Sequence, residues 1–415
     1  GVYFSEGTFE MKGSAVVTPS TSGDTDKPGK NDVYLKSGQA ITVDGTLSHA
    51  HVARITPQSY TATTVLQAGS GVTLKYEVGK FTVTPDVKED GIAQTWIIDS
   101  AGNLKESNME VRYDKLESYL SSYAGGGNTI NRFKITNVPS NYLQSAGYNR
   151  MGRLAQKIHD KNKKVALILP DSIPGLTSME GGFDGCEYLV SLENIPSGVT
   201  NMEGCFKGCT RLTHAPAIPS GPTTMRECFK GCTSLTQAPK IPASIKGIGG
   251  IDGCFEDCTS LTHAPEILAN VEQMKATFKN CKSLTQAPVI PASVGAMEDT
   301  FLGCTSLTQA PVLPTNVTMV GGTFEGCTSL TQAPEIPATV TSMIGCFKGC
   351  TKLTQAPAIP KDITAMPSCF AGCTSLTQAP EIPAKVTTMH NCFEGCTKLA
   401  AATLKCNYNP AVLYK

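Results

Sequence analysis

Charge, tryptophan and long apolar segments are all scarce in this 415-residue chain. Only 17% of the residues are charged, and 35 basic residues balance 35 acidic ones, so the net charge is zero. A chain without excess charge has no long-range attraction for nucleic acid or anionic lipid. No apolar run reaches the length of a membrane-spanning helix. We therefore expect no nucleic-acid partner and no transmembrane segment in this chain, whereas a hydrophobic content of 40% is enough for a buried core.

Residues that carry catalytic chemistry are also sparse. The P-loop, H-E-x-x-H and G-x-S-x-G motifs are absent, and the six histidines are scattered. His214 and His263 replace a glutamine that recurs at the same place, which indicates surface positions. Asp86, Glu89 and Asp90 could imitate the carboxylate pair of a polysaccharide-cleaving enzyme, but a solvated turn is the simpler interpretation. We expect no catalytic, cofactor-binding or metal-binding residues, and the chain is predicted not to be an enzyme.

Repetition is what the sequence has in abundance. From about Pro170 to Leu399 one pattern, V-T-x-M-x-x-C-F-x-G-C-T-S-L-T-Q-A-P-x-I-P, recurs ten times. Successive phenylalanines are 23 residues apart, except where three extra residues occupy the glycine-rich Lys246–Gly253 segment. A fixed short period is typical of a solenoid, in which each unit buries its apolar face against its neighbours. The ten phenylalanines are Phe183, Phe206, Phe229, Phe255, Phe278, Phe301, Phe324, Phe347, Phe370 and Phe393.

Individual positions of the unit can be interpreted physically. The phenylalanine and the leucine six residues later are large apolar anchors of a continuous core. A methionine stands four residues before the phenylalanine in eight units, which predicts that both lie on one face of a short helical turn. Glycine stands two residues after the phenylalanine in eight units, and Asp257 and Asn280 replace it in the others. Because Asn and Asp also tolerate a left-handed backbone, we expect positive φ at this position.

The cysteines follow the same register. All seventeen lie from Cys186 onward: ten stand three residues after the phenylalanine, six stand just before it, and Cys406 is the last. This pattern predicts a ladder of small buried thiols. Disulfides between stacked cysteines of neighbouring units are one alternative. A zinc site at C-x3-C is another, although no histidine recurs beside the pairs as a further ligand.

The sequence before the repeats divides into two parts. Residues 1–110 contain no cysteine and show apolar residues separated by single polar ones, which predicts a β-rich N-terminal domain of short strands. Residues 111–170 are predicted to form an α/β adaptor and N-terminal cap, with helices near 114–123 and 149–160 and strands at 133–138 and 165–169. A solenoid at 171–400 and a C-terminal cap at 401–415 follow, because an open first or last unit would expose apolar surface. The alternating pairs are Phe9/Met11, Val33/Leu35, Ile41/Val43 and Phe81/Val83.

The repeat words FKGCTSLTQAPEIP and VTSM resemble the BspA-type leucine-rich repeats of bacteria, which read roughly F-x-x-C-x-x-L-x-x-I-x-I-P-x-x-V-x-x-I. The resemblance covers about half of the chain and is to spirochaete and Bacteroides surface proteins. One departure is that L-T-Q-A-P-x-I-P is a residue longer and contains a proline, which predicts short strands that kink at Ala-Pro. In the N-terminal domain, GTFEMKGSAVV and NDVYLKSGQAITVDGTL resemble parallel β-helix coils of repetitive spirochaete surface proteins, with an open β-sandwich as the alternative.

The resemblance implies a fold that is mainly β with short helical turns, built on a leucine-rich-repeat solenoid of about ten 23-residue units. It also implies an exported protein at the bacterial cell surface, associated with the outer membrane, although the chain begins at Gly1 without a signal peptide. The implied activity is non-enzymatic adhesion to host extracellular-matrix or bacterial surface proteins, without a cofactor. The alternatives are a purely structural surface spacer and a carbohydrate-active enzyme that works through the N-terminal domain.

The Thr and Gln of L-T-Q-A-P recur in register along the repeats. Such a polar strip is either a binding face or merely the solvated side of the solenoid, and we treat it as the candidate binding face. Its members are Thr236, Gln237, Thr285, Gln286, Thr308, Gln309, Thr331, Gln332, Thr354, Gln355, Thr377 and Gln378.

Overall fold

The computed structural model describes residues 2–4, 6–17, 33–48, 52–84, 86–87, 92–94, 96–106, 109–122, 124, 130–145 and 151–399. Contacts divide the chain into two compact units: Gly1–Thr136 with Lys163–Ile168, and Asn137–Asn162 with Leu169–Lys415. The fold is mainly β with few helices, and none of the described helices is long and apolar enough to cross a membrane. Cys406 and the predicted cap at 401–415 lie outside the described residues.

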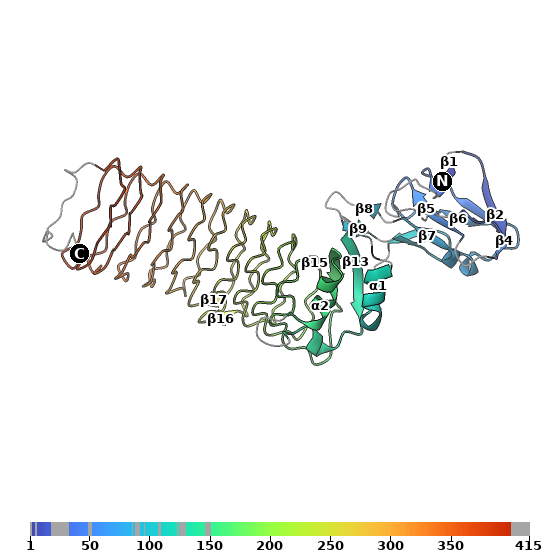
Figure 1. The fold of residues 1–415 in the computed structure, drawn as a ribbon, viewed down its shortest axis with the longest axis horizontal. Coiled ribbons are helices and arrows are strands. Elements are labelled where there is room, and N and C mark those ends of the chain that lie inside the picture. Colours follow the sequence, from blue (N-terminus) through green and yellow to red (C-terminus); the bar gives the residue numbers. More distant parts are fainter. Residues whose placement is uncertain are drawn as a thin grey trace. The chain divides into compact units, whose positions relative to one another are not determined.

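Parallel strands dominate the first unit (Figure 1). One sheet has the order β1-β3-β5-β7 and another has the order β2-β4-β6, and every neighbouring pair in both is parallel. Side chains such as Leu35, Ile41 and Ile55 are fully buried between them in one core. All four predicted alternating pairs fall within strands, which confirms those strand predictions. The strands are β1 (Val2–Phe4), β2 (Phe9–Gly13), β3 (Val33–Leu35), β4 (Ile41–Leu47), β5 (Ala53–Pro57), β6 (Leu66–Ala68) and β7 (Phe81–Val83).

A further sheet of the first unit is organised around β13 (Ile130–Thr136). This strand pairs in parallel with β9, β12 and β14, and β8 pairs with β9 in antiparallel fashion. Strands β10 and β11 form a separate antiparallel pair. Helix α1 (Leu116–Ser122) buries Leu116 and Leu120, and its Tyr119 ring meets Phe133 edge-on at 5.2 Å between centroids. The other elements are η1 (Leu74–Tyr76), η2 (Val78–Lys80), β8 (Asp86–Val87), β9 (Ile92–Gln94), β10 (Trp96–Ile98), β11 (Leu104–Glu106), β12 (Glu110–Arg112), η3 (Tyr113–Lys115) and β14 (Val165–Ile168).

The second unit opens with η4 (Ser140–Tyr142) and helix α2 (Arg153–Asp160). Helix α2 buries the side chains of Leu154, Ala155 and Ile158. It lies against the first repeat, because the Cys186 thiol donates a hydrogen bond to the Ala155 carbonyl at 3.7 Å. The helix predicted near 149–160 therefore covers the apolar start of the repeat array.

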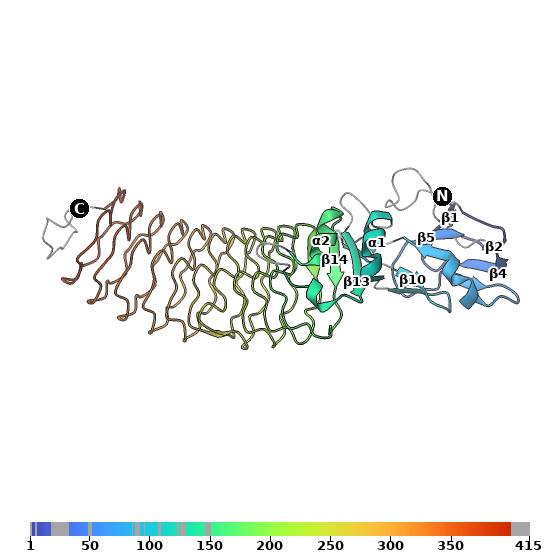
Figure 2. The same ribbon diagram turned by 60° about the horizontal axis from the view of Figure 1, so that its bottom comes forward.

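Successive repeats form a row of similar coils, which is visible from two sides in Figures 1 and 2. The ten phenylalanine rings stack from coil to coil, with centroids 5.2–5.8 Å apart and planes within 14° of parallel. Offset stacking of this kind adds to the free energy gained from burial. The leucines and methionines that repeat with the phenylalanines are buried beside them, except Leu399 in the last described coil. We refer to residues 171–399 as the solenoid.

The backbone around each phenylalanine differs in part from the prediction. The residue two positions after it has positive φ in all ten units, between 59° and 74°, as predicted. The residue two positions before it is also left-handed in all ten, with φ of 51–61°. A left-handed residue cannot continue a right-handed helix, so the segment from methionine to phenylalanine is a succession of turns instead of the predicted helical turn. The non-glycine residues at this second position are Glu227, Ala276, Asp299, Ser368 and Asn391.

Strands in the solenoid are short, as the proline-containing repeat predicted. They are β15 (Leu189–Leu192), β16 (Lys246–Gly247) and β17 (Asn270–Val271), and β16 pairs in parallel with β17. Elsewhere the described coils are joined by single parallel bridges and by regular turn-to-turn hydrogen bonds, such as Phe206 N–H to the Cys228 carbonyl at 2.8 Å. The proline of Ala-Pro has no N–H to donate and so interrupts each ladder next to the bridged residue.

All sixteen described cysteines carry free thiols, and only Cys396 is partly exposed. From Cys209 onward, each cysteine three residues after a phenylalanine donates its thiol proton to the phenylalanine carbonyl of the preceding unit, at 3.1–3.2 Å. Burial raises the pKa of the Cys186, Cys304 and Cys373 thiols to about 12. The predicted ladder of buried thiols is confirmed.

Candidate binding faces of the solenoid

The twelve residues of the predicted Thr-Gln strip are all exposed. Parallel bridges join Gln237, His263, Gln286 and Gln309 in succession, and a further bridge joins Gln355 to Gln378, so the structure brings most of the strip together in two bridged stretches on either side of Gln332. Bridged parallel segments lie about 4.8 Å apart, and the strip therefore presents one glutamine amide at about that interval. His263 occupies the glutamine position, as the sequence indicated, and its Nδ1 lies 2.9 Å from the hydroxyl of its neighbour Thr262.

The two residue types of the strip have different roles. The Thr308 hydroxyl donates to the Thr285 carbonyl of the preceding unit at 3.4 Å, and Thr377 does the same to Thr354. These hydroxyls help to join the coils and are only partly available to a ligand. The glutamine amides of the strip make no hydrogen bond within the described part of the chain. They are therefore the groups that can donate to or accept from a partner.

Exposed apolar side chains accompany the strip. Val289 and Val312 stand at the same position of adjacent units and are 89% and 88% exposed. Val312 also borders a groove of about 510 Å³ together with Pro311, Leu313 and Pro334. Aliphatic side chains this exposed, three residues after a glutamine of the strip in each case, are typical of a surface that another protein covers.

A second ladder of parallel bridges joins the residues five positions before successive phenylalanines, among them Ala296, Met319, Ser342 and Ala365. Met319 and Gln332 are separated by about half of the 23-residue unit, which places the two ladders on different sides of each coil. We call this side the variable face and define it by the residues six, five, three and two positions before each phenylalanine and one position after it.

The variable face differs from unit to unit, unlike the Thr-Gln strip. The residue three positions before the phenylalanine is acidic, basic, apolar, glycine, proline or histidine in different copies. In chain order these residues are Glu180, Glu203, Arg226, Asp252, Lys275, Glu298, Gly321, Ile344, Pro367 and His390. Sequence reasoning missed this face because it treated the unspecified positions of the repeat as ordinary surface. The copy-to-copy variation was the signal that could have found it.

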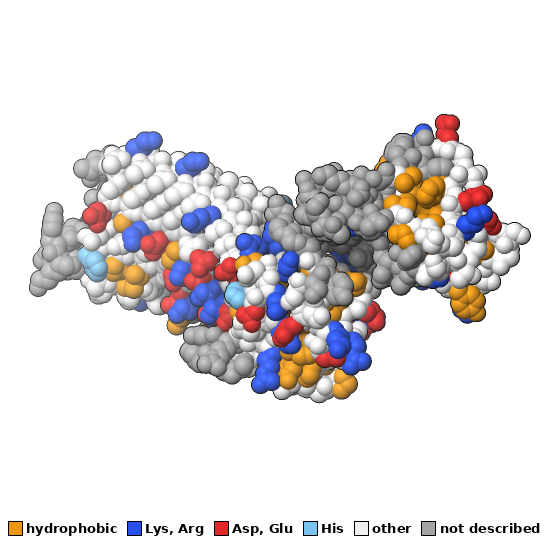
Figure 3. Space-filling view, turned by 45° about the vertical axis from the view of Figure 1, so that its right-hand side comes forward, with side chains coloured by type: hydrophobic (Ala, Val, Ile, Leu, Met, Phe, Trp, Pro, Cys, Tyr) orange, Lys and Arg blue, Asp and Glu red, His pale blue; other side chains and the backbone are white. Residues whose placement is uncertain are grey.

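Ion pairs form a zigzag across the early coils of the variable face. Lys207 forms an ion pair with Glu227 at 2.7 Å. Lys230 lies between two carboxylates, 3.4 Å from Glu227 and 2.8 Å from Glu256. Lys279 also pairs with Glu256, at 3.4 Å. Figure 3 shows side chains of both charges gathered over part of the solenoid, beside a broad area with few charges. Many charged side chains of the early coils are therefore paired with each other, and fewer of them are available to a partner.

The pKa values of this cluster follow from its contacts. Partial burial opposes ionisation of Glu227, but the hydrogen bonds and charges of Lys207 and Lys230 outweigh it and lower the pKa of this carboxyl. Asp184 is half-buried without a hydrogen-bonded cation, and burial raises its pKa despite the nearby Lys207. Asp184 borders a hollow of about 420 Å³ with Glu180 and Glu203.

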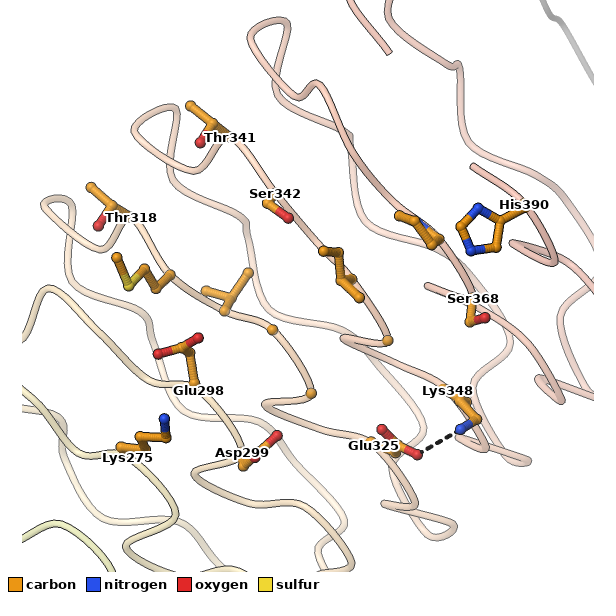
Figure 4. A pocket seen from close by; sticks show the side chains of 17 residues that line it. Lys275, Glu298, Asp299, Thr318, Glu325, Thr341, Ser342, Lys348, Ser368 and His390 are labelled. Atoms are coloured by element: carbon orange, nitrogen blue, oxygen red, sulfur yellow. Dashed lines mark hydrogen bonds and ion pairs between the residues drawn. The ribbon is translucent and has the colours of Figure 1, made fainter. Parts of the chain in front are cut away.

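A larger hollow of about 700 Å³ lies further along the variable face (Figure 4). Its floor contains Met319 and Ile344, which are each 52% exposed. The hydroxyls of Thr318, Thr341 and Ser342 lie along one edge in Figure 4, and carboxylates lie along the other. This combination of apolar floor, hydroxyl edge and acidic edge suits a ligand of mixed polarity.

Neither face contains a catalytic constellation in the part of the chain that is described. Among those residues no group of three or more His, Cys, Asp or Glu side chains could hold a metal ion. Glu89 and Asp90, which sequence reasoning compared with a carboxylate pair, lie outside the described residues. Asp86 belongs to β8, where its backbone pairs with that of Gln94.

A family model for the BspA type leucine-rich repeat region matches residues 169–285, 223–354 and 296–410. Together these matches span more than half of the chain. The chain belongs to the BspA-type leucine-rich repeat family. Members of this family are generally bacterial cell-surface proteins and generally non-enzymatic. The family assignment agrees with the repeat words and with the phenylalanine, leucine and cysteine columns described above.

Solved structures of bacterial leucine-rich repeat proteins are similar to this chain. One from Bacteroides ovatus is 19% identical, with 76% of this chain and 85% of that chain covered and a TM-score of 0.37. A leucine-rich cell surface protein from Faecalibacterium prausnitzii is 20% identical, with 79% and 93% covered and a TM-score of 0.42. A leucine-rich repeat protein from T. pallidum is 25% identical, with 51% and 77% covered and a TM-score of 0.26. A comparison with curated proteins found no match.

Proposed function

We propose that this chain is a non-enzymatic bacterial cell-surface protein whose solenoid binds other proteins through the Thr-Gln strip. Export to the cell surface is part of the proposal and rests on the family. Its partners would be host extracellular-matrix proteins or surface proteins of other bacteria. The finer architecture belongs to the proposal as well: about ten repeat units in the solenoid, preceded by a parallel β-helix-like N-terminal domain, for which the parallel sheets of the first unit are the support.

The observation that carries the proposal is the combination of free amides with exposed valines three residues further along the same coils. The glutamines of the strip can each form hydrogen bonds that the fold does not use, and they recur at regular intervals. Val289 and Val312, at nearly full exposure, supply apolar area beside them. Burying exposed aliphatic surface drives most protein association, and adjacent polar groups set its specificity.

Binding of the full chain to purified extracellular-matrix proteins and to whole bacterial cells tests this function. We expect saturable binding to at least one member of this panel. Val312→Asp should weaken it by about tenfold, because a carboxylate would have to be desolvated at the contact. Ile97→Asp is the matched control, since Ile97 is also an exposed aliphatic residue but lies in β10 of the first unit. Its binding should equal that of the parent chain.

Two outcomes would contradict the proposal. If the full chain binds nothing in the panel, the protein is better explained as a structural spacer whose repeats are retained for packing alone. If binding is found but Val312→Asp and Gln309→Ala leave it unchanged, the strip is not the contact. Far-ultraviolet circular dichroism of each variant checks that a loss of binding is not a loss of fold.

A further inference from the structure

Variation among the copies singles out the variable face. Packing fixes the buried columns of a solenoid, so an exposed column that changes with each copy is free of that constraint. The same side of the coil holds the three-residue insertion, which falls between Ile245 and Ile251 and exposes 74% of Ile248. Insertions in repeat proteins map to loops on one face, often the binding face. Copy variation and the insertion point independently to the same side.

The hollow on this face arises from small residues. Gly321 stands where other units carry Arg226 or Lys275, so no side chain fills the space above the floor. A Cβ at Gly322 would overlap the Asp299 carboxylate, which lies over this glycine. Met319 and Ile344 are consequently left half-exposed inside a groove rather than on a flat surface. A half-exposed methionine beside an isoleucine can accept an apolar side chain of varied shape.

Only some of the charged side chains along the groove form ion pairs. Glu325 bonds Lys348 at 2.9 Å (Figure 4). Glu298 and Asp299, on the same edge, have no ion pair among the residues that the structure describes. Lys275 lines this end as well, and it likewise has no ion pair within that part of the chain. Glu298, Asp299 and Glu325 outnumber the two lysines of the lining, so the edge favours a cationic group.

The length of the groove indicates an extended ligand. Its lining runs from Lys275 to His390, and these two residues occupy the same position in units that are five repeats apart. At about 4.8 Å per bridged unit, this distance is roughly 24 Å. An extended polypeptide rises about 3.3 Å per residue, so about seven residues would span the groove. Peptides that bind in extended form place alternate side chains into pockets of such a surface.

We propose that the groove between Lys275 and His390 binds an extended segment of a partner polypeptide in which an apolar side chain neighbours a lysine or arginine. The apolar side chain lies between Met319 and Ile344, and the basic side chain pairs with Glu298 or Asp299. Backbone groups of the segment face the Thr318, Thr341 and Ser342 hydroxyls. This site lies on the other side of the coil from the Thr-Gln strip and does not depend on the function proposed for that strip.

Selection from a random dodecapeptide library displayed on phage tests the proposal. The full chain is the bait, and phage that also bind the Ile344→Asp protein are removed. We expect the retained peptides to share an apolar residue next to Lys or Arg. A synthetic peptide of that sequence, labelled with a fluorophore, should bind with an anisotropy change that Ile344→Asp weakens by about tenfold or more. Glu298→Lys should also weaken it, and a peptide with the basic residue replaced by Glu should bind less tightly.

Val312→Asp is the matched control on the Thr-Gln strip and should leave peptide affinity unchanged. If it abolishes peptide binding while Ile344→Asp does not, the peptide site is the strip and the present inference is wrong. Enrichment of acidic peptides, or of no peptide at all, would also overturn it. Circular dichroism on Ile344→Asp and Glu298→Lys shows whether each remains folded. Ile344 is exposed and Glu298 is only partly buried, so we expect unchanged spectra.

Discussion

The first unit and the solenoid are both built largely from parallel segments, but they are held together differently. In the first unit, strands of two to seven residues pair by backbone hydrogen bonds, and the buried side chains differ from strand to strand. In the solenoid the coils are joined by single bridges and by regular backbone hydrogen bonds between turns, and the same side chains stack at every level. Stacked phenylalanines, thiol-to-carbonyl bonds and threonine hydroxyls add to those backbone bonds in aligning the coils. Turn-to-turn backbone bonds and identical side-chain ladders can thus together replace extended strands in aligning neighbouring coils.

The comparison extends to the chemistry of the two cores. All seventeen cysteines of the chain lie in the solenoid or after it, whereas the first unit contains none. A core lined with thiols is stable only while those thiols are protonated, because a buried thiolate has neither solvent nor a cation beside it. The two units should therefore respond differently to the same change in pH, to core substitution and to backbone substitution.

Alkaline pH should produce the largest difference between the units. Burial raises the pKa of the solenoid thiols above the ordinary value near 9, to about 12 for Cys186, Cys304 and Cys373. The unfolded chain then loses protons first, so stability is complete below about pH 9 and falls as the pH rises toward 12. Each buried thiol contributes about 1.4 kcal/mol per pH unit to this fall. With ten or more thiols, the loss exceeds a typical domain stability within about one pH unit.

Two optical signals separate the units in this experiment. The single tryptophan, Trp96, lies in β10 of the first unit beside Tyr60, with ring centroids 5.8 Å apart. Its fluorescence reports the first unit alone, whereas thiolate absorbance reports the solenoid. Above pH 9.5 we expect thiolate absorbance to rise cooperatively before the tryptophan signal changes. Simultaneous loss of both signals, or a solenoid that is intact at pH 11, would contradict this account of its core.

Substitution of one cysteine by threonine should be tolerated in one cysteine column and destabilising in the other. In the column just before the phenylalanine, Thr300 and Thr323 are already fully buried, and each donates its hydroxyl to the Met297 carbonyl. Cys346→Thr should therefore change the free energy of unfolding by less than about 0.5 kcal/mol. In the column three residues after the phenylalanine every unit has cysteine. No unit therefore shows that this position has room for the β-branched side chain of threonine. Cys350→Thr should destabilise the solenoid by about 1–3 kcal/mol.

Urea unfolding monitored by far-ultraviolet circular dichroism measures both cysteine variants, with Trp96 fluorescence as the reference for the first unit. The tryptophan transition should be the same in both variants. Equal destabilisation by Cys346→Thr and Cys350→Thr would show that the columns are not chemically distinct. It would then follow that the thiol-to-carbonyl bond at 3.1 Å from Cys350 to Phe324 contributes little to alignment.

The positions that have the same packing role in every repeat were predictable from the sequence. The phenylalanine, leucine and cysteine columns, and the left-handed residue after the phenylalanine, could be inferred because each requires one or two residue types. The strands of the first unit followed from alternation at pairs such as Val33/Leu35. The Thr-Gln strip was predicted as an exposed row, but its threonine hydroxyls have a role in joining coils that composition alone does not reveal.

Features that packing does not repeat were missed. The left-handed residue before the phenylalanine is glycine in only half of the units, so its residue type gave no clear signal and a helical turn was predicted instead. The groove around Met319 and Ile344 depends on which side chains six adjacent units place side by side. No single repeat contains the residues that line this groove, and a consensus repeat omits the differences between units that form it.

A further small effect is expected from the backbone at that missed position. In the described part of the first unit every residue with positive φ is a glycine, whereas the solenoid places Ala276 at φ 52°. Ala276→Gly should stabilise the solenoid by about 0.5–1 kcal/mol, because relief of the left-handed strain exceeds the entropy that glycine adds to the unfolded chain.

Gly345→Ala, at φ 60° with space for a Cβ, should destabilise it by a similar amount. Ala292→Gly, outside the left-handed region, should also destabilise it, which separates strain relief from a general effect of glycine. Urea unfolding of the three variants measures these differences. Stabilisation by Ala292→Gly, or loss of stability in Ala276→Gly, would show that the solenoid does not store backbone strain in these turns.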